Sequence, residues 1–248
     1  MSLERHYDKT FFNDQTTGSL GSAREVLPFV FNLIKPESVI DFGCGRGTWL
    51  KAALDIGVKE AVGIEGYWVK KEDLFDPRIE LINTNLEDEI KLGRKFDLAI
   101  SLEVGEHLSY KRADSFIGDI TEAADIVLFS AALPGQGGEN HINEQPASFW
   151  VDKFKQRGFS YIDCIRSRFW ANEKVGPAYR QNSFLFVKNE ISMDIPKEYV
   201  LPASMIDIVH PIVHDWAVKR KPGIFGTLHA IKRLPGMIFR KVILRKKH

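Results

Sequence analysis

The sequence predicts a doubly wound α/β fold, in which helices cover both faces of one sheet. Three observations support this prediction. Short apolar runs typical of buried strands alternate with helical patterns through most of the chain. The first run leads straight into a glycine-rich loop, and the first two runs each end in an acidic residue. A chain of 248 residues with 44% hydrophobic residues is long enough for one such domain.

The elements follow one another in a regular order. Residues 1–19 are polar and aromatic without a clear period, so we interpret them as a lid or substrate-side extension. Ser22 is a candidate N-cap for a helix over residues 23–31, which ends before Pro36. Strands are then predicted at residues 37–42, 60–65, 79–84, 96–101, 125–130, 159–166 and 182–188.

The glycine-rich loop predicts a cofactor that contains adenosine. Gly43, Gly45 and Gly47 alternate after the first strand, where backbone N–H groups can approach a ligand at a helix N-terminus. Nicotinamide and flavin sites use a different spacing, Gly-x-Gly-x-x-Gly, to hold a pyrophosphate. Asp41, directly before the loop, would repel a pyrophosphate but suits the ammonium group of a methionine moiety.

Here the chain resembles the class I S-adenosylmethionine (SAM)-dependent methyltransferases, whose first motif is hydrophobic-x-Asp/Glu-x-Gly-x-Gly-x-Gly. The resemblance implies a Rossmann-like sheet of seven strands, mostly parallel, with the last strand antiparallel, and SAM as the cofactor. Glu65 at the end of the second strand would accept the ribose hydroxyls. Many members carry Asp where this chain has Asn85 beside the adenine. The implied cofactor-binding residues are Asp41, Gly43, Gly45, Gly47, Glu65, Asn85, Leu86 and Leu102.

Acidic and imidazole side chains gather after the fourth strand, on the substrate side. If a helix starts there, Glu103, Glu106 and His107 lie at i, i+3 and i+4 and share one face. His141 follows the fifth strand, and the loops after these two strands are adjacent in a doubly wound sheet. Two carboxylates on one face are costly unless a positive charge lies between them, which a divalent metal would supply.

This pattern resembles metal-dependent methyltransferases, namely the small-RNA 2′-O- and ubiquinone-pathway O-methyltransferases. The resemblance implies that Glu103, Glu106, His107 and His141 bind a metal, and carboxylates with imidazoles suit Mg²⁺ or Mn²⁺. The catalytic candidates are then Glu106, His107 and His141. Without a metal, His107 or His141 could act as a general base unaided.

A looser resemblance connects the chain to methyltransferases of surface-glycan clusters and implies a sugar hydroxyl as acceptor. It is carried by residues 137–150 and 201–211. Trp68, Trp150 and Trp170 are candidate stacking platforms for sugar rings, with core packing as the alternative.

Four functions therefore compete. The leading one is an O-methyltransferase that acts on a saccharide or small polyol. The others are an RNA ribose 2′-O-methyltransferase, an N-methyltransferase of an amino sugar, and a non-catalytic methyltransferase-like subunit that binds a partner.

Charge is distributed unevenly along the chain, although the formal net charge is only +1. Residues 215–248 contain ten Lys and Arg against one acid, whereas residues 1–214 contain 24 basic and 32 acidic side chains. The basic residues alternate with apolar clusters, which suits an anionic membrane surface or a phosphate-binding arm. A helix packed on its own domain is the alternative. The acidic body makes a nucleic-acid partner the weaker hypothesis.

We divide the chain into an N-terminal extension (1–19), an α/β methyltransferase domain (20–190) and a connector with a basic amphipathic C-terminal extension (191–248). No window is long and apolar enough for a spanning helix, and no secretory leader is evident. Two cysteines give no disulfide framework. We therefore expect a cytoplasmic protein with peripheral association at the inner membrane surface.

Overall fold

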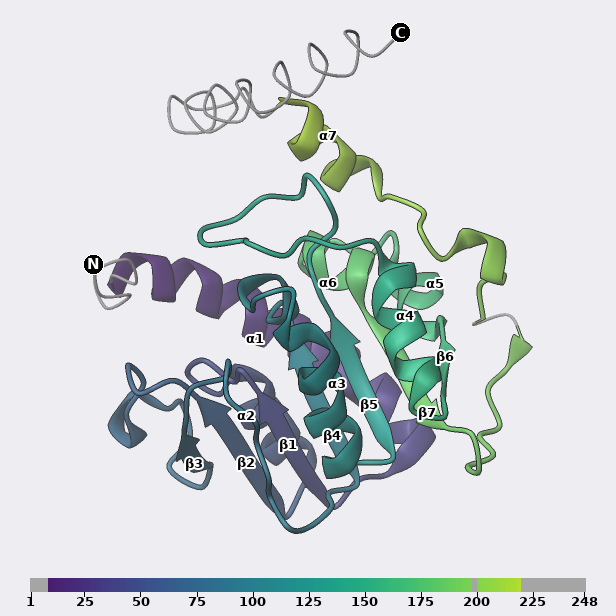
Figure 1. The fold of residues 1–248 in the computed structure, drawn as a ribbon. Helices are drawn as coiled ribbons and strands as arrows, with labels where there is room; N and C mark the ends of the chain where they lie inside the picture. The colour runs from purple at the N-terminus through teal and green to yellow at the C-terminus, as the bar shows by residue number, and fades with distance from the viewer. Residues whose placement is uncertain (1–8, 198–199, 220–248) are drawn as a thin grey trace, which may run out of the picture.

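The protein is built around one seven-stranded sheet with helices on both faces (Figure 1). The computed structural model describes residues 9–197 and 200–219. The strand order is β3-β2-β1-β4-β5-β7-β6, and β7 runs antiparallel to both of its neighbours while the other pairs are parallel. The strands are β1 (Ser38–Phe42), β2 (Glu60–Glu65), β3 (Glu80–Asn83), β4 (Leu98–Leu102), β5 (Ile126–Ser130), β6 (Phe159–Ile162) and β7 (Phe184–Lys188). The predicted fold class is confirmed.

The described residues also form seven α-helices and three short 3₁₀ turns whose bounds are complete. Apolar residues of α3 and α4 pack on one face of the sheet, and those of α1, α2 and α5 pack on the other. The helices are α1 (Lys9–Ile34), α2 (Thr48–Ile56), α3 (Arg112–Ala123), α4 (Ala147–Gln156), α5 (Cys164–Phe169), α6 (Pro177–Asn182) and α7 (Pro211–Lys219). The 3₁₀ turns are η2 (Lys71–Asp73), η3 (Gly105–His107) and η5 (Ala203–Met205).

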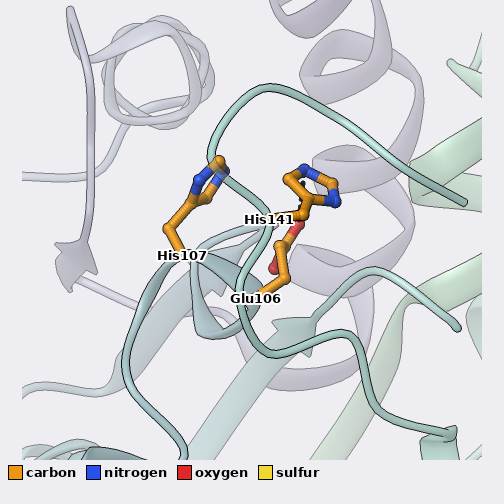
Figure 2. Close-up of side chains that lie close together, drawn as sticks. All are labelled: Glu106, His107 and His141. Atoms are coloured by element: carbon orange, nitrogen blue, oxygen red, sulfur yellow. Dashed lines mark ion pairs between the residues drawn. The ribbon is translucent and has the colours of Figure 1, made fainter. Parts of the chain in front are cut away.

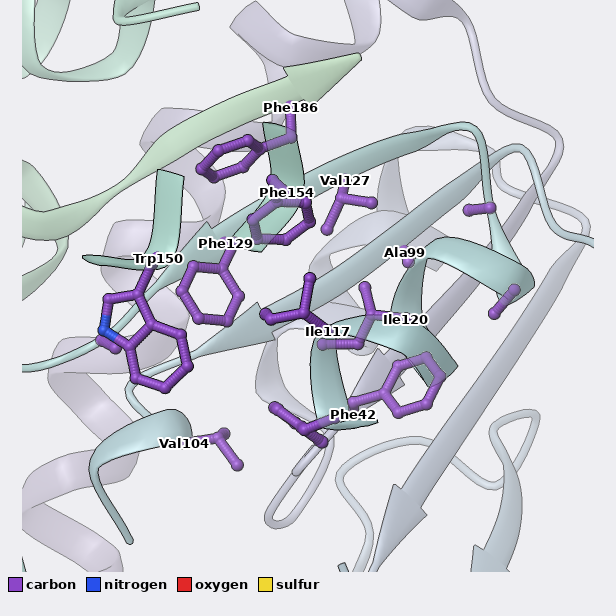
Figure 3. Packing of buried hydrophobic residues seen from close by; sticks show 14 of the residues in the cluster. Phe42, Ala99, Val104, Ile117, Ile120, Val127, Phe129, Trp150, Phe154 and Phe186 are labelled. Atoms are coloured by element: carbon purple, nitrogen blue, oxygen red, sulfur yellow. The ribbon is translucent and has the colours of Figure 1, made fainter. Parts of the chain in front are cut away.

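The core consists of two apolar layers, one on each face of the sheet, because side chains along each strand alternate between the faces. On the α3 and α4 face an aromatic cluster joins helix and sheet (Figure 3). Phe154 stacks on Phe186 with ring centroids 3.7 Å apart, and Phe129 meets Phe154 edge to face at 5.3 Å. Each buried aromatic side chain contributes about 1.5–3 kcal/mol through burial. This rigid core holds the loops at the carboxyl edge of the sheet.

Two local predictions were wrong. Ser22 is not an N-cap, because α1 begins at Lys9 and includes it. Its hydroxyl donates to the Gly18 carbonyl at 2.7 Å and accepts the Gly176 N–H at 2.9 Å, so it joins α1 to a distant loop. The sixth strand ends at Ile162 rather than at residue 166, since α5 begins at Cys164.

The predicted C-terminal extension is described only as far as α7. Most of its basic residues lie at positions 220–248, outside the described residues. Among the described helices, none is both long and apolar enough to cross a membrane.

Candidate functional site

The glycine-rich loop joins β1 to α2 in a conformation that only glycine adopts without strain. Gly43, Gly45 and Gly47 have φ values of +84°, +52° and +77°. Two of them also lack space for a side chain. A Cβ on Gly43 would lie 2.5 Å from a methyl carbon of Val104, and one on Gly47 would lie 2.7 Å from the Cδ1 atom of Ile79. The loop is therefore packed tightly against the residue that precedes β3 and against the chain that follows β4.

Two buried carboxylates stand beside this loop. Glu65 accepts the N–H groups of Gly45 at 2.7 Å and Gly66 at 2.8 Å, so the end of β2 is tied to the loop after β1. Burial raises the pKa of the Asp41 carboxyl well above its usual value, and the nearby Glu65 adds to the increase. Burial also raises the pKa of Glu65, against the two backbone N–H groups that lower it. The pair forms a dry acidic pocket that favours a cationic, hydroxyl-bearing ligand.

A cavity of about 460 Å³ opens between these residues and the exits of β3 and β4. Seven of the eight predicted cofactor residues line it: Asp41, Gly43, Gly45, Glu65, Asn85, Leu86 and Leu102. Gly47 does not line the cavity but forms the N-cap of α2. The Asn85 side chain is engaged locally, because its amide donates to Asp88 at 3.2 Å and its oxygen accepts the N–H of Glu87.

Sequence reasoning missed several residues of this cavity. Ser19 of α1 and Tyr179 of α6 both line it. They reach it through long-range packing, which leaves no local signal in the sequence. Asn83 was also missed. Its amide donates to the carbonyls of Gly66 and Val69 at 3.0 and 2.9 Å and so fixes the loop after β2.

Only one of the three predicted tryptophan platforms is at the cavity. Trp68 lines the cavity and is 45% exposed. Trp150 is buried in the aromatic core, 5.3 Å from Phe129, so it does not present a face to a ligand. Trp170 packs against His210 with ring centroids 4.7 Å apart.

A cluster of three possible metal ligands lies next to the cavity. The ligand atoms of Glu106, His107 and His141 are all within 4.8 Å of one another (Figure 2). The His141 Nε2 atom is 3.9 Å from Glu106 Oε1, and the two imidazole rings meet edge to face at 4.9 Å. His107 also lines the cofactor cavity, so the cluster and the cavity are contiguous.

The Glu106 side chain is fully buried, yet neither carboxylate oxygen receives a hydrogen bond from the described residues. The backbone N–H groups of Glu106 itself and Ala132 are close but outside hydrogen-bond geometry. Burial raises the pKa of Glu106 well above its usual value, and the charge of Glu103 adds to the increase. Burial likewise lowers the pKa of His107 to about 4, with a further contribution from His141. His107 is thus a neutral imidazole at neutral pH.

The loop between β5 and α4 positions His141. Glu144 contacts His141 Nδ1 at 2.9 Å and also accepts the N–H groups of Gly135, at 2.8 Å, and Gly137. A carboxylate on Nδ1 fixes the tautomer in which Nε2 keeps its lone pair, and Nε2 is the atom nearer Glu106. The Glu106 carbonyl in turn accepts the N–H groups of Ile142 and Asn143 at 2.9 and 3.0 Å.

The structure separates Glu103 from this cluster. The prediction that Glu103, Glu106 and His107 share a helical face was wrong, because only the single 3₁₀ turn η3 forms there. Glu103 precedes that turn with φ +58°, a conformation uncommon for a residue with a side chain. Its carboxylate accepts hydrogen bonds from the amides of Gln136 at 2.8 Å and Asn182 at 3.0 Å.

The residues present fit a divalent cation. One buried carboxylate without a hydrogen-bond donor and two imidazoles, one with a fixed tautomer, offer three ligand atoms of the kind that Mn²⁺ and related ions accept. Such an ion would supply the positive charge that the buried Glu106 lacks.

The strand order, the glycine-rich loop and the acid at the end of β2 together define the class I SAM-dependent methyltransferase fold. Residues 19–124 match the family described as a methyltransferase domain. This part of the chain is therefore similar to a methyltransferase domain, and its sheet has the fold that the resemblance in the sequence implied.

Individual known proteins agree with this assignment. A ribosomal protein L11 methyltransferase of Haemophilus influenzae is 34% identical over 125 residues, which cover 50% of this chain and 39% of the relative. The SAM-bound structure of CalS10, an amino pentose methyltransferase from Micromonospora echinaspora, has a TM-score of 0.54 at 12% identity, covering 75% of this chain and all of that one. An O-methyltransferase family protein from Burkholderia thailandensis has a TM-score of 0.52 at 14% identity, covering 72% and 57% of the two chains. Likeness at this level establishes the fold.

Proposed function

We propose that this protein transfers a methyl group from SAM to a hydroxyl group of a saccharide, with a divalent cation held by Glu106, His107 and His141. The observation that carries the proposal is the buried Glu106 carboxyl group, which accepts no hydrogen bond from the described residues, beside two imidazoles, one of which lines the cofactor cavity. An amine acceptor needs no metal to become a nucleophile, whereas a hydroxyl must lose a proton.

The chain's own residues have separate tasks in this reaction. Asp41 and Glu65 provide the acidic surroundings for the amino-acid and ribose parts of the cofactor. Glu144 holds the His141 ring, and the Gly135 and Gly137 N–H groups hold Glu144. A divalent cation, when bound, lowers the pKa of a coordinated hydroxyl and fixes its position. His107 lies at the boundary between cluster and cavity, and its lowered pKa keeps the imidazole neutral and able to bind the cation at neutral pH. The coordinated hydroxyl would then lose its proton to solvent water.

A saccharide acceptor is supported by the exposed aromatic surface at the cavity. The Trp68 ring lies across the backbone of Gly66, where a Cβ would come within 2.1 Å of it. The ring thus rests on the backbone on one side and is 45% exposed, which suits stacking against a sugar. The resemblance of residues 137–150 to glycan-cluster methyltransferases points to the same acceptor class.

The test is transfer of labelled methyl from SAM to fractionated glycans, glycolipids and RNA, with and without EDTA. We expect label in the glycan or glycolipid fraction, abolished by EDTA and restored by Mn²⁺ or Mg²⁺. Label that EDTA does not affect would remove the metal from the proposal and leave His107 or His141 as the base. Label in RNA would replace the saccharide with a ribose acceptor. Failure to bind S-adenosylhomocysteine, together with no transfer to any fraction, would favour a non-catalytic role.

A further inference from the structure

The chain between β7 and α7 is attached to the domain by buried polar groups. The Arg166 side chain, 0% exposed, donates to the carbonyls of Met205 at 3.0 Å and Ile206 at 2.8 Å. The Gln181 amide donates to the Ile208 carbonyl at 2.9 Å, and its oxygen accepts the His210 N–H. These bonds hold the start of α7 in a fixed place, so the direction of its side chains is set by the fold.

Several apolar side chains of α7, and one just before it, are exposed to solvent. Val213 is buried, at 2% exposure, and supplies the inward contact of α7. Ile212 and Trp216 are 38% and 41% exposed, and their spacing of four residues places them on one side of the helix. Val209, just before the helix, is 46% exposed. A helix of a globular domain ordinarily turns such residues inward, so this exposed set needs a partner.

The exposed set lies on the same side of the molecule as the cofactor cavity. A Cβ on Gly135 would lie 3.3 Å from the Cβ of Ala217, so α7 packs against the loop that carries His141 and Glu144. The same loop presents Ile142, which is 66% exposed and lines the cavity. Figure 1 shows α7 above this loop, beyond the carboxyl edge of the strands.

The charge of the adjoining sequence identifies the partner. Residues 219–248 contain ten Lys and Arg and no acid, and they include the apolar clusters 237–239 and 242–244. Basic residues alone would fit a nucleic acid equally well. Exposed Val, Ile and Trp side chains together with basic residues fit the headgroup region of a bilayer, where aliphatic groups are buried and Trp is favoured.

We propose that Val209, Ile212 and Trp216 form a membrane-docking surface, which acts with the basic residues that follow it to bind an anionic lipid bilayer beside the cavity. This surface is independent of the proposed methyl transfer. If both the methyl transfer and the membrane docking are correct, the acceptor is a saccharide carried on a lipid, and the bilayer holds it on the side of the molecule where the cavity lies.

The test is sedimentation of the full-length protein with phosphatidylcholine vesicles that do or do not contain phosphatidylglycerol. We expect binding to the anionic vesicles only, weakening as salt is added. The double variant Ile212→Ser/Trp216→Ser should bind them at least about tenfold more weakly, because burial of these two side chains is lost. The matched control is Ile56→Ser, since Ile56 is 42% exposed at the far end of α2 and should not contact the bilayer. S-adenosylhomocysteine binding shows that each variant is folded, and no methyl acceptor is needed.

Three results would overturn the proposal. Equal binding to neutral and anionic vesicles, or to neither, would remove the anionic bilayer as partner. A double variant that binds like the wild type would assign the affinity to the basic segment alone. Binding of single-stranded RNA without binding of vesicles would assign the surface to a nucleic acid.

Discussion

The surroundings of Asp41 disfavour a charged carboxylate in the free protein, and a cationic ligand would stabilise that charge. It is 3% exposed, and its burial, together with the charge of the nearby Glu65, raises its pKa well above the usual value. The substitution Asp41→Asn keeps the shape but removes the charge that would face the cofactor's ammonium group. We expect binding of SAM, measured by calorimetry, to weaken at least about tenfold, since a charge-assisted hydrogen bond contributes about 1.5–3 kcal/mol.

The control for Asp41 is Asp55→Asn on α2, where Asp55 pairs with Lys51 at the surface. This variant should bind SAM like the wild type. Equal binding by Asp41→Asn would show that the ammonium group of the cofactor lies elsewhere.

Substitutions of Glu103 and Glu106 distinguish a metal site with four ligands from one with three. The sequence predicts four ligands including Glu103, whereas the structure brings three together without it. A saturating excess of Mn²⁺, at about 100 times its Kd, stabilises a folded protein by about 2.7 kcal/mol, which is about 5–10 °C in Tm for a chain of this size. We expect Glu106→Gln to lose this increase and Glu103→Gln to keep it, both measured as the Mn²⁺-dependent shift in Tm.

Loss of the Mn²⁺ effect in both variants would support the four-ligand set, with Glu103 turning toward the metal on binding. Retention in both would rule out a metal site in this cluster. The sequence could indicate these residues by type and spacing. It could not place Glu103, because the left-handed backbone at this residue and its bonds to Gln136 and Asn182 depend on distant parts of the chain.

At the scale of elements, the conformation of the loop between β5 and α4 depends on the contacts of one residue, Glu144. Glu144 joins His141 to two backbone N–H groups of the same loop. We expect Glu144→Gln to reduce Mn²⁺ affinity about 10–100-fold, as is typical when the partner of a metal-binding histidine is removed. Titration with Mn²⁺ measures this directly. Glu122→Gln, an exposed residue on α3, is the control and should leave the affinity unchanged. A Glu144 variant with wild-type affinity would mean that His141 is oriented by other contacts.

The strands were predictable from sequence and some of the helices were not. Each strand is a short apolar run between turn residues, so its existence follows from local composition. The first helix starts far earlier than its pattern indicates, and the Ser22 hydroxyl, inside this helix, accepts the Gly176 N–H instead of capping a helix end. The turn after β4 is a single 3₁₀ turn. Gly105 in this turn lies against the Trp150 ring, and the Glu106 carbonyl accepts hydrogen bonds from the loop that carries His141. Such long-range contacts have no signature in a sequence window.

At the scale of the whole molecule, strand order explains why distant residues form one site. The exits of β1, β2, β3 and β4 lie side by side, so acids and glycines separated by up to about 60 positions surround one cavity. The position of these residues around one cavity could be predicted from the alternation of strands and helices, once the strand order is known. The path of the chain from β7 to α7 could not be predicted in this way, because it depends on buried hydrogen bonds from Arg166 and Gln181.

The concentration of buried acids at one edge predicts how stability depends on pH. The pKa values of Asp41, Glu65 and Glu106 are all raised in the folded protein. The folded state therefore binds more protons than the unfolded state, and the free energy of unfolding falls as pH rises above the ordinary carboxyl range. His107 acts in the opposite direction only below about pH 6.5, because its pKa of about 4 in the folded state is below its ordinary value.

We expect the free energy of unfolding of the free protein to fall as pH rises from about 4.5 to 8.5, measured by urea denaturation across this range, because the three acids with raised pKa values outweigh the opposing effect of His107. The double variant Asp41→Asn/Glu106→Gln should flatten the decrease, since two of the three acids no longer ionise. Addition of S-adenosylhomocysteine and Mn²⁺ to the wild type should flatten it as well, because their positive charges favour the ionised carboxylates. Stability that rises steadily up to pH 8.5 would mean that these acids are hydrated or paired in solution. Their buried charge would then no longer be a reason to expect a cationic cofactor and a divalent cation at this edge.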